Sequence, residues 1–140
     1  MSNYKTKDNT KEVLSALDKA IERGLEAIGL TAEGHAKRKI TSYPAVDTGR
    51  LRNSITFAIS GEKANTTTYT DNNKGVYNYS GTAPDDKEKA VYIGTNVEYG
   101  KHVELGTSKM AARPFLKPAA TEHSEEYKRI MEAALKSADP

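Results

Sequence analysis

Histidines are the side chains of this sequence best suited to hold a metal or transfer a proton, and they stand at positions 35, 102 and 123. Glu98 and His102 are four residues apart in a segment with helical spacing, so a helix would place them on one face. With Glu104, they could form the metal site of a hydrolase. The competing interpretation is an ordinary surface pair on a helix. The spacing favours the surface pair, and we expect no metal site.

The other motifs of catalysis are missing. The sequence has no phosphate-binding GxxxxGK[ST] and no GxGxxG after a strand, and no serine lies in a nucleophile elbow. Asp85 and Asp86 read as solvated loop residues. Cysteine is absent, which excludes thiolate zinc sites, iron–sulfur clusters, disulfides and cysteine nucleophiles. We therefore expect a protein that is not an enzyme and has no cofactor.

The chain has the length of a single domain and contains few large apolar side chains. Its 140 residues carry a formal charge of +2 and include eight tyrosines. Val, Ile, Leu and Phe make up only 23 residues, which predicts a thin core stabilised by neighbouring subunits. A small, marginally stable monomer is the alternative. Without a signal peptide or an apolar run of about 20 residues, we expect a soluble protein made in the cytosol and no membrane contact.

The first regular pattern is helical. From Thr10, apolar residues recur every three or four positions and predict a helix of about thirty residues, which Tyr43 and Pro44 end. Gly24 and Gly29 would pack closely against a facing helix, or Gly29 would interrupt this one. The predicted inner face carries Val13, Leu14, Leu17, Ala20, Ile21, Leu25 and Ile28, and continues through Ala32, Ala36 and Ile40.

Short strands and helices follow. Asp47 or Thr48 caps a turn that runs to Ser54, and residues 91–95 form a core strand paired in an antiparallel sheet. A short helix is expected at 98–105. A final helix at 118–137 would turn inward Ala119, Ala120, Ile130, Met131, Ala134 and Leu135. Residues 55–60, between the turn and the core strand, alternate with a period of two and predict a half-buried strand. Ile55, Phe57 and Ile59 would lie on its core face, and Thr56, Ala58 and Ser60 on the other.

Residues 61–90 differ from the rest because they are prone to form strands yet nearly free of aliphatic side chains. Residues 66–70 and 76–79 flank a good turn sequence and predict a hairpin, which has too little apolar surface to be stable alone. The fold class is therefore α+β: a long N-terminal helix and a C-terminal helix on a small antiparallel sheet, with a protruding hairpin. We expect a flexible 1–9, one domain at 10–137 with 61–90 as a mobile arm, and a flexible 138–140.

Positive charge gathers in two segments, at 37–52 and 101–117. If they are adjacent in the fold they form one basic face, while the last helix is acidic. Such a face would serve electrostatic complementarity between subunits or bind duplex DNA, or it would be an ordinary solvated surface. Its cations are Lys37, Arg38, Lys39, Arg50, Arg52, Lys101, Lys109, Arg113 and Lys117.

Three segments in this order carry a resemblance: VDTGRLRNSI at 46–55, VYIGT at 91–95 with VEY at 97–99, and VELGT at 103–107 leading to ARPFLKPA at 112–119. Together they resemble the small tail-component family of long-tailed bacteriophages and prophages, whose members are minor tail, tail-completion or head–tail joining (neck) proteins. The resemblance runs from about Leu14 to Ala134. The sequence departs from the family pattern at Gly100, His102 and Leu105, and in a longer, more polar 61–90.

The resemblance implies a structural virion protein assembled in the cytoplasm of the bacterial host. Such proteins form a homo-oligomeric ring, expected to be sixfold, that completes the tail end and contacts the tail terminator and the neck or connector proteins. DNA would pass near it in the channel. A duplex-DNA-binding module that uses the basic face remains the alternative.

Roles for single residues follow from combining the motifs with their chemistry. Glu104 is a candidate partner for an arginine of its own or a neighbouring subunit. The interface candidates are Arg50, Arg52, Glu104, Arg113, Tyr69, Tyr77 and Tyr79. The residues expected to serve the fold are Asp47, Thr48, Gly49, Gly106, Pro114 and Phe115.

Overall fold

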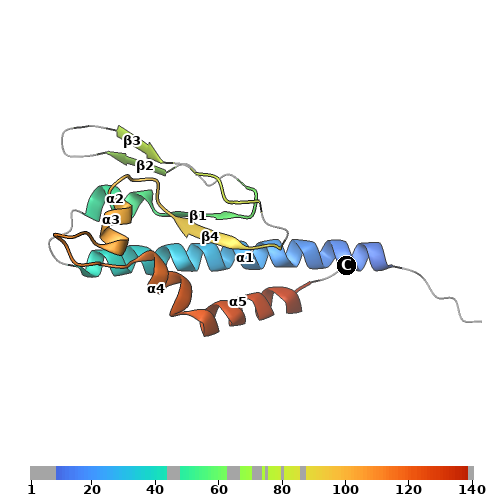
Figure 1. Cartoon of the computed structure of the whole chain (residues 1–140). Coiled ribbons are helices and arrows are strands. Elements are labelled where there is room, and N and C mark those ends of the chain that lie inside the picture. Colours follow the sequence, from blue (N-terminus) through green and yellow to red (C-terminus); the bar gives the residue numbers. More distant parts are fainter. Residues whose placement is uncertain are drawn as a thin grey trace, which may run out of the picture.

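One long helix organises the molecule (Figure 1). The computed structural model describes residues 9–43, 48–62, 67–70, 74, 76–79, 81–85 and 88–138. Helix α1 spans Thr10–Ser42, 33 residues, which confirms the predicted helix and its start. Gly24 and Gly29 do not interrupt it. The strands β1 and β4 pack on one side of α1, and the helices α4 and α5 pack on another.

Two small antiparallel sheets follow α1. Strand β1 (Thr56–Ile59) pairs with β4 (Val91–Gly94), with Phe57 opposite Ile93. Strand β2 (Thr67–Thr70) pairs with β3 (Val76–Tyr79) to form the predicted hairpin. This hairpin lies beside helix α2 (Thr48–Ser54) in Figure 1. The predicted α+β class, with its long helices, antiparallel sheet and hairpin, is confirmed.

The main core lies at the C-terminal end of α1. There α1 meets α2, the short helix α3 (Gly100–Leu105) and the start of α4 (Leu116–Thr121). Small and branched side chains pack here around Phe115, which is fully buried. The buried members are Ala36, Ile40, Leu51, Ile55, Val97, Val103, Phe115 and Ala119.

The prediction of a half-buried first strand was wrong, because both of its faces are covered. Ile59 lies in the interior as expected, but Thr56 and Ala58 on the opposite face are buried too. Residues 81–85 fold back over this second face, where Ala83 packs against Ala58. Backbone hydrogen bonds fix the return: the Ala83 N–H donates to the Glu62 carbonyl at 3.0 Å. A polar segment with little periodicity supplied the cover, so the alternation in β1 could not reveal it.

The predicted single C-terminal helix was also wrong, since it breaks at Glu122 and His123. Helix α4 ends at Thr121 and α5 spans Ser124–Lys136. The break lets α4 stay on the core while α5 turns to run along α1, and the Tyr127 hydroxyl donates across it to the Ala119 carbonyl. Ala120, expected on the inner face, is exposed.

Two glycines of α1 are contact points for other elements. A Cβ at Gly24 would come within 2.7 Å of the Met131 sulfur and 3.2 Å of the Ala134 Cβ, both on α5. One at Gly29 would overlap the Phe57 ring on β1. The expected close packing of a facing helix is therefore found at Gly24, whereas at Gly29 a strand approaches instead.

Candidate assembly surface

A bidentate ion pair links two of the sequence motifs at the end of the molecule that carries α2 and α3. Arg50 of α2 donates from both terminal nitrogens to the Glu98 carboxylate, at 3.1 and 3.2 Å. The Arg50 guanidinium also lies over the Tyr99 ring, 5.7 Å from its centroid. Hydrogen bonds from the Glu98 backbone N–H and from Arg50 hold the pKa of the Glu98 carboxyl below its ordinary value. Arg50 thus has a partner within its own chain.

Glu104 caps a helix rather than pairing with an arginine in the described structure. Its Oε2 accepts hydrogen bonds from the backbone N–H groups of Phe115 (2.7 Å) and Leu116 (2.9 Å), and its Oε1 accepts one from Lys117 (2.9 Å). The first backbone N–H groups of a helix have no acceptor within the helix, and Phe115 at the N-cap of α4 makes no side-chain cap bond. Glu104 supplies the missing acceptors. The carboxylate of α3 therefore fixes the direction in which α4 leaves the connector.

The connector between α3 and α4 is held by its backbone. Gly106 has φ 77°, and a Cβ there would come within 2.7 Å of the Ala112 nitrogen, so only glycine fits the turn. The Arg113 N–H donates to the Val103 carbonyl at 2.7 Å, and the Tyr43 hydroxyl donates to the Pro114 carbonyl at 2.8 Å. Together these bonds deliver Phe115 to the core.

The remaining predicted residues are placed in less detail. Arg52 on α2 is exposed, while Gly49 and Arg113 are half-buried. Asp47 lies outside the described residues, and Thr48 is the first residue of α2. The three tyrosines of the hairpin have a described backbone only: Tyr69 pairs with Tyr77, and Tyr79 with Thr67.

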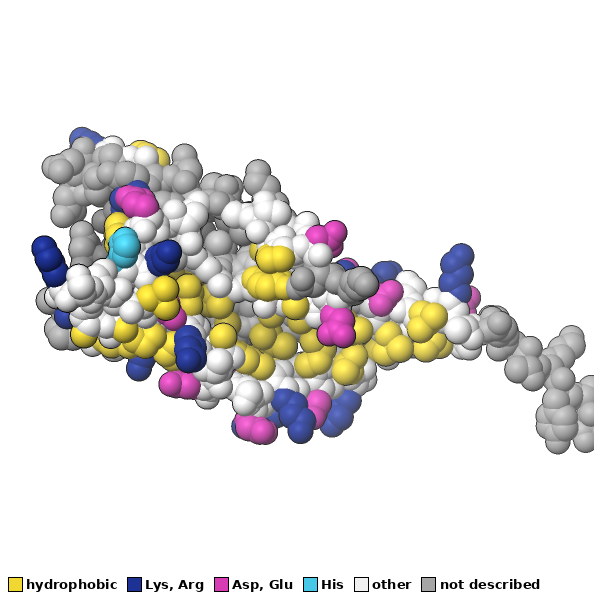
Figure 2. Space-filling view, in the orientation of Figure 1, with side chains coloured by type: hydrophobic (Ala, Val, Ile, Leu, Met, Phe, Trp, Pro, Cys, Tyr) yellow, Lys and Arg dark blue, Asp and Glu magenta, His cyan; other side chains and the backbone are white. Residues whose placement is uncertain are grey.

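The two basic segments lie at the same end of the molecule, because the Tyr43–Pro114 hydrogen bond joins them. Part of their charge is matched locally, since Lys37 lies 3.5 Å from Glu33 and Arg50 is paired with Glu98. On the face seen in Figure 2, basic and acidic side chains are interspersed. Arg52 on α2 and Lys101 on α3 are both exposed.

The N-terminal part of α1 carries apolar side chains that no described part of the chain covers. Leu14 is 56% exposed, and Val13 and Leu17 are each 36% exposed. All three were predicted to lie on the inner face of the helix. In Figures 1 and 2 this part of α1 extends past the end of α5, and hydrophobic side chains continue along it. The predicted inner face is thus buried only from Ala20 onward.

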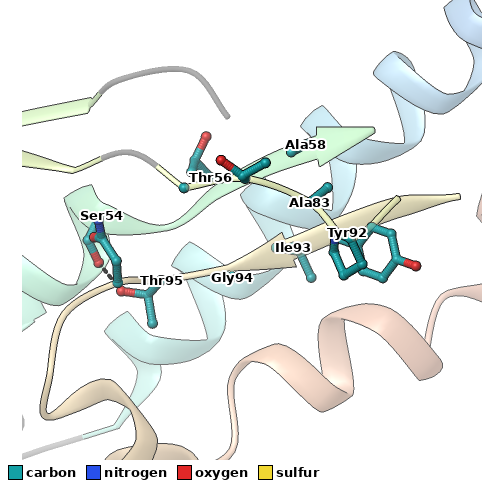
Figure 3. Close-up of a pocket in the computed structure, with 12 residues that line it drawn as sticks. Ser54, Thr56, Ala58, Ala83, Tyr92, Ile93, Gly94 and Thr95 are labelled. Carbon is teal, nitrogen blue, oxygen red and sulfur yellow. Dashed lines mark hydrogen bonds between the residues drawn. The ribbon is translucent and has the colours of Figure 1, made fainter. Parts of the chain in front are cut away.

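A small cavity lies on the face of the β1–β4 sheet opposite α1 (Figure 3). It measures about 190 Å³, is open to solvent on one side, and is lined mainly by β1, β4 and residues 81–84. Its described lining has hydroxyl groups but no carboxylate or imidazole. At one end the buried Ser54 hydroxyl is hydrogen-bonded to Thr95 and to the Leu51 carbonyl. The cavity is therefore mainly an apolar gap in the packing.

The metal site considered in the sequence does not form in the described structure. Glu98 is bound to Arg50 and Glu104 to the start of α4, which leaves His102 exposed on α3. Instead, the described residues bring His35 and His123 together with Glu126. This group was not predicted from the sequence, because a contact such as that of His35 with Glu126, 91 positions apart, leaves no local pattern.

The chain matches a known protein family. The family model for HK97-gp10-like bacteriophage tail-component proteins matches residues 5–106. The chain belongs to this family. No curated protein and no solved structure matches it.

The HK97-gp10-like match covers the elements from α1 to α3 and ends at Gly106. It includes the DTGRLRNSI, VYIGT and most of the VELGT motifs, whereas ARPFLKPA, α4 and α5 lie beyond it. As a tail component of this family, the protein is a structural part of the phage virion. No helix in the described ranges is both long and apolar enough to cross a membrane.

Proposed function

We propose that this HK97-gp10-like protein acts as a homo-oligomeric ring, sixfold in the particle, that completes the end of the phage tail and helps to join it to the head connector. The observation that carries the proposal is the uncovered apolar stretch of α1 formed by Val13, Leu14 and Leu17. Exposed apolar side chains that continue a buried stripe are typical of surfaces that meet a partner. The tail-component family supplies the setting.

The apolar stretch cannot hold subunits together unaided. Full burial of a Leu or Val side chain contributes about 1.5–3 kcal/mol, and these three are only 36–56% exposed. Covering what remains of them therefore contributes less than the association cost of about 4–15 kcal/mol. Further contacts must therefore be made, and we assign them to Arg113 and the hairpin tyrosines. Closure of a ring stabilises the assembly, because each subunit then contacts a neighbour on two sides.

The surfaces of the ring that do not contact a neighbouring subunit would contact other virion proteins. We assign the tail terminator and the neck or connector proteins as these partners. The charged groups around α2 and α3, including Arg52, lie at the end of the molecule farthest from the free end of α1. One subunit therefore offers two separate surfaces, one for its neighbour and one for a different protein.

The proposal is tested by the Leu14→Glu/Leu17→Glu double variant, with Ser15→Glu as its control. Ser15 is also exposed on α1 but lies outside the apolar stripe. We expect the double variant to fold, to remain monomeric in light scattering, and to be missing from purified particles, because each new carboxylate must be desolvated at the contact. Ser15→Glu should be incorporated normally. Equal incorporation of both variants would refute the role of this surface.

Particles that lack the protein test its place in assembly. We expect separate full heads and tails in negative-stain images, or tails with irregular ends. Complementation with the wild-type chain should restore joined particles. Joined, infectious particles without the protein would contradict the proposal.

Duplex-DNA binding is the second candidate, favoured by the Tyr43–Pro114 bond that brings the basic segments to one end. It predicts binding whose affinity falls steeply with salt, with a log–log slope that reflects several phosphate contacts. The local pairing of Lys37 and Arg50 reduces the charge available for it. The absence of salt-dependent duplex binding by the free protein would remove this candidate.

A further inference from the structure

Two histidines from distant parts of the chain stack at the point where α4 ends and α5 begins. The rings of His35 on α1 and His123 at the break are parallel within 3°, and their centroids are 3.5 Å apart. Glu126 in the first turn of α5 places its Oε1 2.6 Å from His35 Nε2. One ligand atom from each of these three residues lies within 4.8 Å of the other two.

The hydrogen bonds define the protonation of His35. Arg38 has only donors, and its guanidinium lies 2.8 Å from His35 Nδ1. Nδ1 therefore accepts, and Nε2 carries the proton that is donated to Glu126. The cluster thus holds a neutral imidazole beside a carboxylate, which are the forms that bind transition metals.

We propose that His35, His123 and Glu126 form a binding site for a divalent transition-metal ion such as Zn²⁺. Two imidazole nitrogens and one carboxylate oxygen are a donor set that suits zinc, cobalt, nickel or copper rather than magnesium or calcium. Three protein ligands leave the fourth position of a tetrahedral shell to water. The site is separate from the proposed assembly surface, since none of its three residues is among those assigned to that surface.

Binding needs at least one imidazole ring to turn out of the stack, because the nitrogen lone pairs lie in the ring planes and two parallel rings cannot direct them at one ion. Tetrahedral ligands at about 2.0–2.2 Å from zinc stand about 3.4 Å from one another, so the His35–Glu126 contact must open while the widest separation closes. The proton on His35 Nε2 moves through solvent to Nδ1, and the metal takes the vacated lone pair. Arg38 must then release Nδ1, which it can do because its side chain is exposed.

The consequence of binding is structural. His123 stands at the break, so a metal held between it and His35 fixes the direction in which α5 runs along α1. Because the ligands come from α1, the break and α5, the ion favours the native packing over the unfolded chain. A metal ion bound at this site would therefore hold α5 against α1.

Titration of the metal-free, full-length protein with Co²⁺ tests the proposal, because a low-coordinate cobalt site gives strong visible absorption bands. We expect saturable bands with one ion per chain. His123→Gln and Glu126→Gln should weaken binding about tenfold or more. His102→Gln is the matched control, since His102 is exposed on α3 outside the cluster, and it should bind like the wild type.

Arg38→Gln provides a sharper test. This change removes a competing positive charge and frees His35 Nδ1, so the affinity for Co²⁺ should rise. Addition of Zn²⁺ should displace the cobalt bands and raise the melting temperature of the wild type but not of His123→Gln. Circular dichroism in the presence of a chelator verifies that each variant folds.

A measurement without any variant guards against altered folding. Bound Co²⁺ should broaden the NMR signals of His35 and His123 and spare those of His102. A spectrum of hydrated cobalt only, binding that His123→Gln leaves unchanged, or equal broadening of all three histidines would each overturn the proposal.

Discussion

The two ends of α1 differ in what the rest of the chain supplies to them. At the C-terminal end, Ala36 and Ile40 are fully buried against α2 and the start of α4. At the N-terminal end, Leu14 and Leu17 continue the same helical stripe but remain exposed. Residue type and spacing are alike at both ends, so hydrophobic periodicity indicates a buried face without telling which molecule buries it. Folding depends on one end, and we assign association to the other.

The largest effect on folding is expected at the core end. Phe115→Ala removes a fully buried ring and should lower the free energy of unfolding by about 3–5 kcal/mol. Leu14→Ala, at the free end, should change it by less than about 0.5 kcal/mol. Urea denaturation of both variants as monomers measures the difference. If both variants lost similar amounts of unfolding free energy, the free end of α1 would also contribute to the stability of the monomer. The difference between the two ends of α1 would then be refuted.

A smaller effect is expected where the core end is capped. Glu104→Gln replaces the charged acceptor of three backbone N–H groups with a neutral amide and should cost about 1–2 kcal/mol of unfolding free energy. Glu132→Gln on the exposed side of α5 is the matched control and should be nearly neutral. Denaturation curves that coincide for the two variants would mean that the cap adds nothing to stability.

The smallest effect is expected from the exposed pair of Arg50 and Glu98. Because the pKa of Glu98 is lowered in the folded chain, its contribution to stability is present above the unfolded pKa and is lost as the pH falls through the folded one. Solvent screens the pair, so the change is slight. NMR titration of the Glu98 carboxyl should give a midpoint below that of a model peptide, and Arg50→Gln should move it upward. A midpoint that the substitution leaves in place would exclude the pairing in solution.

Local patterns were enough to predict most of the elements. The three- and four-residue spacing after Thr10 predicted α1, and turn residues between two polar strand-like segments predicted the β2–β3 hairpin. The capping residues Asp47 and Thr48 predicted a turn that runs to Ser54, where the structure has the short helix α2. These features depend on backbone preferences and hydrophobic periodicity within a few residues, which a single sequence displays directly.

Features made by distant residues were missed. Nothing around His35 signals a contact with His123, and nothing in β1 signals the cover that Ala83 provides. The role of Glu104 left one trace that could have been found: the start of α4 has Phe115 where a capping Ser, Thr, Asp or Asn is usual. A helix without its own cap requires an acceptor from elsewhere, and Glu104 was already singled out as the acidic residue of its motif.

The length of α1 sets the distance between the two ends of the subunit. A helix of 33 residues is about 50 Å long, and it runs without interruption from the leucines at its free end to the packed core. A neighbour bound at one extremity would thus leave the other clear for a second protein. Such a rod would also carry a tilt imposed at its tip across the full width of the subunit.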